Sequence, residues 1–317
     1  ESAGRGGCTA FRALMMDSAV TNSATIDVSD VDAVAALVVR GASRLCFSND
    51  AARCGYCKGD HWLRECASLT SVDCDGLEQL RLVGMMWLFN CKNLTSLDCT
   101  GLTRIEAVGH WWLSDCKSLA TLTCTGLECL VAVGDYWLHN CSALTALDCS
   151  KGATHLRTVG NLWLSNCVRL TTLDCAGLSR LRTVGNRWIS NCAALTKLDC
   201  AGLSTLHAVA DYWLAGCTSL TTVDFTELTQ LYTVGRYWLS RCSSLIAVDF
   251  SGLSNLQSVG EAWLADCVAL TSLDCNGLTG LQTVGDYWLY QCFRVSSVVC
   301  GRSEIDSWSV PGGARRS

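Results

Sequence analysis

Residues 160–175 read Gly160-Asn-Leu-Trp163-Leu-Ser-Asn-Cys167-Val-Arg-Leu-Thr-Thr-Leu-Asp-Cys175, and this pattern returns about every 25 residues. Its tryptophan recurs ten times, at Trp62, Trp87, Trp112, Trp137, Trp163, Trp188, Trp213, Trp238, Trp263 and Trp288. Eight of the nine steps are 25 residues long, and the step from Trp137 to Trp163 has 26 because an extra residue falls within 150–153. Self-similarity at a fixed period indicates a solenoid, in which each copy packs on its neighbours.

Each copy is expected to turn nine residues inward. In the copy that ends at Cys116 these are Leu94, Leu97, Cys99, Leu102, Ile105, Val108, Trp112, Leu113 and Cys116. The first three alternate with polar residues, which predicts a short strand. The last four share one side of a helical wheel, which predicts a helical turn. An N-cap type often stands two residues before the Trp: Asp60, Asp135, Asn161, Asn186, Asp211 and Asp286.

The tryptophan column is predicted to be the largest single stabilising feature, because each Trp can bury on the order of 200 Å². The repeat covers most of the chain, so we expect one elongated unit.

The segments Leu144-Thr145-Ala-Leu147 and Val159-Gly160-x-x-Trp163-Leu-x-x-Cys167 resemble the BspA-like branch of the leucine-rich-repeat family. Its pattern is roughly Leu-Thr-x-Ile-x-Ile-Pro-x-x-Val-x-x-Ile-Gly-x-x-Ala-Phe-x-x-Cys. Here Trp replaces Ala, Leu replaces Phe, Asp-Cys ends the strand, the Pro is missing and two residues are added. The resemblance implies a surface or secreted recognition protein that binds a host or environmental macromolecule. The rival function is an intracellular scaffold or adaptor with reduced, buried thiols.

The expected fold is an α/β repeat solenoid of about ten 25-residue leucine-rich repeats. We expect a right-handed curved coil with a parallel concave β-sheet and short helical turns on the convex side. The repeat is predicted to span residues 46–300. Residues 1–45 form an N-terminal flank with a cap helix near 30–40, and residues 301–317 form a C-terminal cap and loose tail.

Composition narrows the function classes. The chain has 317 residues, half of them hydrophobic and one of them proline, which is typical of an ordered chain with a large core. A net charge of −5 without a basic run argues against nucleic acid as a partner. No stretch is long and apolar enough for a transmembrane helix. Because the chain begins at Glu1 rather than Met, we expect a fragment or processed form.

Most of the 23 cysteines occupy two repeat columns. Ten lie four residues after each repeat Trp, from Cys66 to Cys292. Eight more follow the predicted strand: Cys74, Cys99, Cys124, Cys149, Cys175, Cys200, Cys275 and Cys300. Phe225 and Phe250 stand in this second column in two copies, so the position is predicted to be an apolar core position. Buried free thiols are favoured over a disulfide ladder, and they favour a reducing compartment.

Cys54, Cys57, His61 and Cys66 resemble a zinc knuckle that is one residue short before the His. Zn²⁺ takes four Cys or His ligands in a tetrahedral arrangement. The repeat itself accounts for Cys66, so free thiols are the favoured interpretation, with zinc and a cap disulfide as the alternatives. No other cofactor is expected.

The candidate binding face is a column of aspartates on the solvent side of the strands. Its members are Asp73, Asp98, Asp148, Asp174, Asp199, Asp224, Asp249 and Asp274, and Thr123 interrupts it. Parallel strands lie about 4.8 Å apart, so the carboxylates are expected to stack. The column is either an acidic groove for a basic partner or cations, or a solvated face with local hydrogen bonds.

The alternative binding site is an aromatic edge formed by the residue before the Trp. It comprises Trp111, Tyr136, Tyr212, Tyr237 and Tyr287. Interfaces favour such anchors, although packing against the turn explains the same residues. The five histidines (His61, His110, His139, His155 and His207) fall in different repeat columns, and no catalytic set recurs, so no enzyme is expected.

Overall fold

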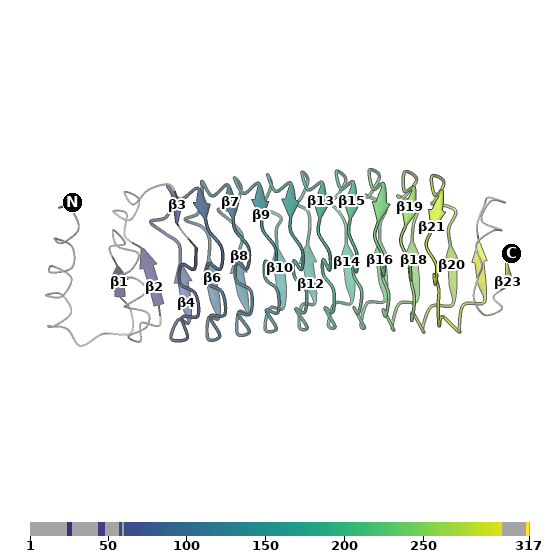
Figure 1. Cartoon of the computed structure of the whole chain (residues 1–317), viewed down its shortest axis with the longest axis horizontal. Helices are drawn as coiled ribbons and strands as arrows, with labels where there is room; N and C mark the ends of the chain where they lie inside the picture. Colours follow the sequence, from purple (N-terminus) through teal and green to yellow (C-terminus); the bar gives the residue numbers. More distant parts are fainter. Residues whose placement is uncertain (1–23, 27–43, 48–56, 59, 300–314, 317) are drawn as a thin grey trace, which may run out of the picture.

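The computed structural model describes residues 24–26, 44–47, 57–58, 60–299 and 315–316. The chain forms a parallel β-solenoid whose coils follow one another in a nearly straight row (Figure 1). Each complete coil contributes one strand of three residues and, on the opposite side, one strand of two residues. The cap helix expected near 30–40 and Trp308 lie outside the described residues.

Eight of the three-residue strands end in an aspartate, and we call the side of the solenoid that these strands form the Asp face. From β4 onward, the three-residue strands are β4 (Ser71–Asp73), β6 (Ser96–Asp98), β8 (Thr121–Thr123), β10 (Ala146–Asp148), β12 (Thr172–Asp174), β14 (Lys197–Asp199), β16 (Thr222–Asp224), β18 (Ala247–Asp249), β20 (Ser272–Asp274) and β22 (Ser297–Val299). At the N-terminal end β1 (Ala24–Ile26) and β2 (Arg44–Phe47) precede β4, and β23 (Arg315–Arg316) pairs with β22. The Asp face consists of three sheets: β1-β2-β4-β6-β8, β10-β12-β14-β16-β18 and β20-β22-β23.

The two-residue strands form one continuous ten-stranded parallel sheet, and we call their side the Val face. They are β3 (Cys57–Lys58), β5 (Leu82–Val83), β7 (Ala107–Val108), β9 (Ala132–Val133), β11 (Thr158–Val159), β13 (Thr183–Val184), β15 (Ala208–Val209), β17 (Thr233–Val234), β19 (Ser258–Val259) and β21 (Thr283–Val284). Equivalent residues pair in register across neighbouring coils, as Val159 does with Val184.

The segment around each Trp is a chain of turns, so the predicted helical turn was wrong. Within residues 60–299 no α-helix occurs. Leu162, Leu164 and Asn166 have φ values of 61°, 55° and 62° and alternate with Trp163 and Ser165, whose φ is negative. Their amides bond to other coils: Leu162 N to Asn186 O (2.7 Å), Leu164 N to Trp137 O (3.1 Å) and Asn166 N to Ser190 O (2.8 Å). A helix would use these amides within its own segment.

The helical wheel had placed Val159, Trp163, Leu164 and Cys167 on one face, and all four are indeed buried. The alternating turn achieves that burial while keeping neighbouring coils at strand spacing. Helices pack 8–10 Å apart and strands about 4.8 Å apart, so helices on one side would curve the stack. Strands on both sides leave it straight, and the expected concave sheet is accordingly flat along the axis (Figure 1).

The residues predicted as N-caps form an Asp and Asn ladder between coils instead. The Oδ1 atom of Asp135 accepts the amide of Asn161 (2.6 Å), and the Oδ1 atom of Asn161 accepts the amide of Asn186 (2.8 Å). Asn186 and Asp211 continue the series toward Arg236. With no helix to cap, these side chains satisfy the amide of the equivalent residue in the next coil.

The predicted core is confirmed. All nine inward residues of the copy ending at Cys116 are at most 3% exposed. The indole rings of consecutive Trp residues stack 5.2–5.8 Å apart and within 18° of parallel along the whole column. Phe225 and Phe250 are buried against this column, 5.3–5.7 Å from the rings of Trp213, Trp238 and Trp263, so their position is apolar as expected.

The thiols that follow each Trp do more than fill space. We call Cys66 to Cys292 in this position the inner thiol column. The Sγ atom of Cys167 donates to Leu138 O at 3.1 Å, and each column member from Cys91 to Cys292 makes the same bond to a leucine or isoleucine carbonyl of the preceding coil. A cysteine therefore supplies a small apolar body and a donor together. Burial raises the pKa of the Cys167 thiol to about 12.

A glycine at the corner after the Asp face strand permits close stacking in most coils, although Glu227 occupies the equivalent position in one of them. A Cβ atom on Gly177 would overlap the Cys149 carbonyl oxygen, so no larger residue fits there without a shift of the coil. The extra residue of the 26-residue copy lies at this corner, where Ala153 is buried with a φ of 55°. The Trp137 and Trp163 rings remain stacked at 5.2 Å across it.

Trp163→Ala should lower the free energy of unfolding by about 3–5 kcal/mol, because truncating a large core residue leaves a cavity. Chemical denaturation followed by circular dichroism measures the change. Tyr232→Ala is the control, since Tyr232 is 49% exposed and should shift the curve little. If both variants lowered the free energy of unfolding by the same small amount, the Trp column would not be the main stabilising feature.

Denatured, unreduced protein should titrate close to its full count of 23 thiols. Reductant should leave the melting temperature unchanged, because the cysteines from Cys66 to Cys292 are free and, apart from Cys129, buried. Thiol titration in denaturant checks the first expectation and calorimetry with and without reductant the second. A low thiol count would instead indicate disulfides and an oxidising compartment.

Candidate functional site

Each aspartate of the Asp face ends its strand and caps the turn that follows. The Oδ1 atom accepts the backbone amide two residues on, at 2.8–3.0 Å. This bond is made by Asp73, Asp98, Asp148, Asp174, Asp199, Asp224, Asp249 and Asp274. Such a bond is an Asx turn, and it gives a structural reason for an Asp or Asn at this position.

The turn bonds also hold some carboxylates in their charged form. The amide and hydroxyl of Thr226 lower the pKa of Asp224, and the Lys197 ammonium lowers it further. The hydroxyl and amide of Ser150 lower the pKa of Asp148. Hydrogen bonds to a carboxylate favour ionisation, so these aspartates stay negative well into the acid range.

The middle of the Asp face is hollowed and acidic. The hollow is lined by the exposed residues Ala146, Ala176 and Ala201 beside the exposed aspartates Asp148, Asp174 and Asp199. The three carboxylates belong to neighbouring strands in register, with Asp148 opposite Asp174 and Asp174 opposite Asp199. The small alanine side chains beside them leave the three carboxylates exposed to solvent.

The aromatic edge divides into three groups. The Trp111 and Tyr136 rings stack at 3.7 Å, and the Tyr212 and Tyr237 rings stack at 4.6 Å. The Arg187 guanidinium lies 4.5 Å from the Tyr212 ring centroid. Tyr287 stands apart from these pairs, is 65% exposed and meets the edge of Tyr290. The structure thus brings four of the five predicted aromatics into pairs.

All residues directly before a repeat Trp have positive φ, and so do those three positions after it. The later position uses residues that tolerate this conformation in seven of ten coils: Asn90, Asp115, Asn140, Asn166, Asn191, Gly216 and Asp266. The position before the Trp holds none of these three types in residues 61–287, although a bulky residue there costs roughly 1 kcal/mol or more. Stacking between neighbouring rings offsets part of that cost.

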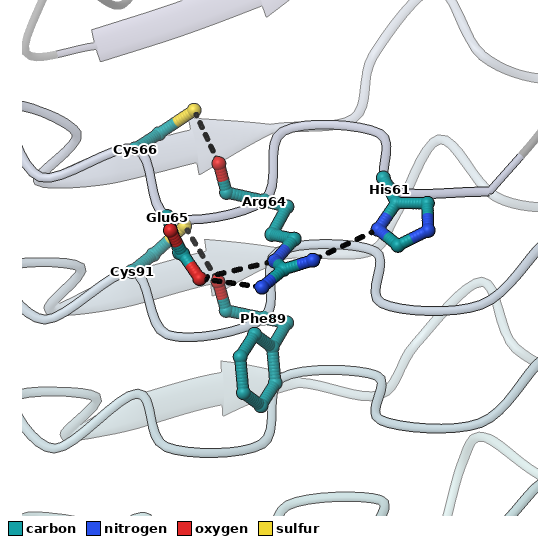
Figure 2. Close-up of polar contacts among 6 residues, drawn as sticks. All are labelled: His61, Arg64, Glu65, Cys66, Phe89 and Cys91. Carbon is teal, nitrogen blue, oxygen red and sulfur yellow. Dashed lines mark hydrogen bonds and ion pairs between the residues drawn. The ribbon is translucent and has the colours of Figure 1, made fainter.

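The zinc-knuckle residues are not brought together by the structure as far as it describes them. Cys54 and the side chain of Cys57 lie outside the described residues. Figure 2 shows the Arg64 guanidinium at His61, with Nη1 donating to His61 Nδ1 at 3.3 Å. The Cys66 thiol points away and donates to Arg64 O at 3.7 Å. The same guanidinium is paired with the Glu65 carboxylate at 2.8 Å. The zinc interpretation stays an untested alternative, because two of its four side chains lie outside the described residues.

The histidines remain apart. His61, His110, His155 and His207 are exposed, and His139 is half-buried beside the Tyr136 ring. Burial lowers the pKa of His139. Among the described residues no group of three His, Cys, Asp or Glu side chains is placed to hold a metal ion. In that same part of the chain no helix has the length and apolar character needed to cross a bilayer.

The repeating strand, corner and Trp turn define a leucine-rich-repeat solenoid. The sequence matches the BspA type leucine rich repeat region over residues 59–196 and 182–308, with six copies. The chain therefore belongs to the BspA-type leucine-rich-repeat family. Among curated proteins, none matches it significantly.

Solved structures of bacterial proteins align with most of this chain. A leucine-rich repeat protein from Bacteroides ovatus aligns at 17% identity and a TM-score of 0.51, covering 77% of this chain and 70% of that one. A leucine rich cell surface protein from Faecalibacterium prausnitzii aligns at 15% identity and a TM-score of 0.41, covering 77% and 76%. The functional domain of InlJ from Listeria monocytogenes, which includes a cysteine ladder, aligns at 18% identity and a TM-score of 0.32, covering 86% and 65%.

Asp224→Ala should lower the free energy of unfolding by about 0.5–1.5 kcal/mol at pH 7, because the Thr226 amide loses its acceptor. Asp224→Asn keeps an acceptor oxygen and should lose less. The folded pKa of Asp224 is lowered, so its electrostatic contribution is present above the unfolded pKa near 3.8 and is lost as pH falls through the folded pKa. Urea unfolding at pH 7 and pH 3 measures both effects. If Asp224→Ala lost as much unfolding free energy at pH 3 as at pH 7, the turn would not depend on the charge of Asp224.

Proposed function

We propose that this chain is a non-enzymatic recognition module that binds a macromolecular partner through the Asp face. The fold supports this role because a solenoid offers a long, regular surface rather than a closed pocket. The observation that carries the proposal is the hollow that exposes Asp148, Asp174 and Asp199 in register.

The proposed contact residues are Asp98, Asp148, Asp174, Asp199, Asp224 and Asp249. Those from Asp148 to Asp249 are exposed and lie on the five hydrogen-bonded strands of one sheet. Neighbouring carboxylates about 4.8 Å apart repel by roughly 0.8 kcal/mol in water. A partner that places lysines or arginines along the column, or bridges to it through cations, relieves that repulsion. The proposed partner is therefore a basic or cation-bridged protein segment.

The second candidate face is the aromatic edge around Tyr212 and Tyr237. The observation that favours it is the placement of bulky aromatics at positive φ, where Asn or Gly is less strained. Arg187 adds a cation over the Tyr212 ring. Tyr, Trp and Arg are the residue types enriched at interface hot spots.

The two faces are separated by matched variants and a synthetic oligolysine peptide as probe. Asp174→Asn, Asp199→Asn and Asp224→Asn together should abolish oligolysine binding measured by calorimetry, because they remove charge and keep the turn acceptors. Binding to the unaltered chain should weaken as salt rises, since exposed charges are screened over about 8–10 Å.

Tyr212→Ala with Tyr237→Ala is the control and should leave oligolysine binding unchanged. Loss of binding in this double variant, together with retention in the triple aspartate variant, would move the binding face to the aromatic edge. A repeat with calcium and a neutral peptide tests the cation-bridged form, which the triple aspartate variant should also lose.

A further inference from the structure

The Val face carries a basic patch beside the start of β11, β13 and β15. The patch comprises His155, Arg157, Arg180, Arg182 and His207, and all five are exposed. Its members lie over one another on neighbouring coils, because the amide of Arg182 donates to Arg157 O (2.9 Å) and the amide of His207 donates to Arg182 O (2.9 Å). Arginine therefore follows arginine along the solenoid at strand spacing, about 4.8 Å.

The same column shows how an arginine is neutralised elsewhere in the solenoid. Arg81 pairs with Glu106 of the next coil, with 3.2 Å between Nη2 and Oε1. The arginines of the basic patch differ, because within the part of the chain that the structure describes the side chains of Arg157, Arg180 and Arg182 form no ion pair or hydrogen bond. A row of guanidinium groups without a counter-charge repels itself and attracts anions.

A shallow groove continues from the basic patch along the Val face. It is lined by Thr183, Ala208, Thr233 and Ser258, which belong to β13, β15, β17 and β19 in turn along the rod (Figure 1). The hydroxyl groups of Thr183, Thr233 and Ser258 bond to no other described residue. Tyr232 continues the column of the basic patch directly before β17 and is 49% exposed. The groove thus joins free hydroxyl groups and an exposed ring to the row of guanidinium groups.

We propose that the basic patch and this groove bind a linear anionic polysaccharide, which lies along the solenoid axis with its acidic groups on Arg157, Arg180 and Arg182. A guanidinium group can bind an oxyanion through two parallel hydrogen bonds. The groove hydroxyls both donate to and accept from sugar hydroxyls, and the Tyr232 ring offers an apolar face to a sugar ring. This surface lies on the opposite side of the solenoid from the Asp face, so the proposal does not depend on the binding proposed there.

The sheet topology favours a polysaccharide over an acidic peptide. An extended peptide that binds a sheet gains affinity by adding its backbone to an exposed edge strand. The strands β11, β13, β15, β17 and β19 each pair with a neighbour on both sides, so none of these five strands offers a free edge. A ligand in the groove therefore meets side chains alone, and hydroxyl and guanidinium groups are the donors that it finds there.

Titration calorimetry of the full chain with dextran sulfate, a sulfated glucan, tests the proposal. Uncharged dextran of the same length is the ligand control and should not bind. Arg157→Gln with Arg182→Gln should weaken the Kd for dextran sulfate at least about tenfold, because charge-assisted hydrogen bonds to two guanidinium groups are lost. Gln257 and Gln282 occupy the same column, so glutamine fits at these positions.

Arg169→Gln with Arg294→Gln is the matched control, because it removes the same charge from two exposed arginines outside the basic patch and should leave the Kd unchanged. Thr233→Tyr fills the groove without a change of charge and should weaken binding of dextran sulfate. Equal losses in the two arginine double variants would mean attraction to overall charge and would overturn the site. Polyglutamate bound as tightly as dextran sulfate, with the same loss in the patch variant, would overturn the polysaccharide in favour of an acidic protein segment.

Discussion

The whole structure depends on backbone hydrogen bonds that pass from each coil to both neighbours. In the strands they are ordinary parallel pairings, and in the Trp turn the amides of residues with positive φ reach alternately forward and back. Because both sides of every coil are held at strand spacing, each residue lies directly over its equivalent. The Trp, thiol and Asp columns follow from that alignment, which also lets one buried side chain satisfy a group on the next coil.

Because of this alignment, every hydrogen bond that one coil makes, and every polar group that it leaves without a partner, recurs along the chain. The Cys S–H groups satisfy carbonyls in the interior, and the Asp and Asn ladder satisfies amides near the surface. The indoles show the opposite case. The Nε1 atoms of the eight Trp residues from Trp87 to Trp263 are buried and have no hydrogen-bond partner among the described residues. Each such donor costs about 1–3 kcal/mol, and the apolar area and stacking of the ring must exceed that cost.

The sequence period was sufficient to predict the core and the Asp column, but not the conformation of the Trp turn. The spacing of Leu, Trp and Cys predicts which residues face inward. It does not distinguish a helix from an alternating turn, because both conformations bury Val159, Trp163, Leu164 and Cys167. The deciding signal lies in the polar residues: Asn166, Asn191 and Gly216 recur where a left-handed residue is needed. Without a helix there is no N-cap, so Asn161 and Asn186 would then have been predicted to bond to the amides of the next coil. The Asx turns could not be predicted until the ends of the strands were known. The spacing of the zinc-knuckle residues gave no indication that Arg64 lies beside His61.

The two faces differ in continuity, and this difference sets how the molecule can bend. The Val face is one sheet of ten strands, whereas the Asp face is interrupted between β8 and β10 and again between β18 and β20. Strand pairing therefore resists bending along the whole Val face, whereas the Asp face lacks it between β8 and β10 and between β18 and β20. The five strands that carry Asp148 to Asp249 lie between these two places, so a partner bound to them would contact one continuous sheet.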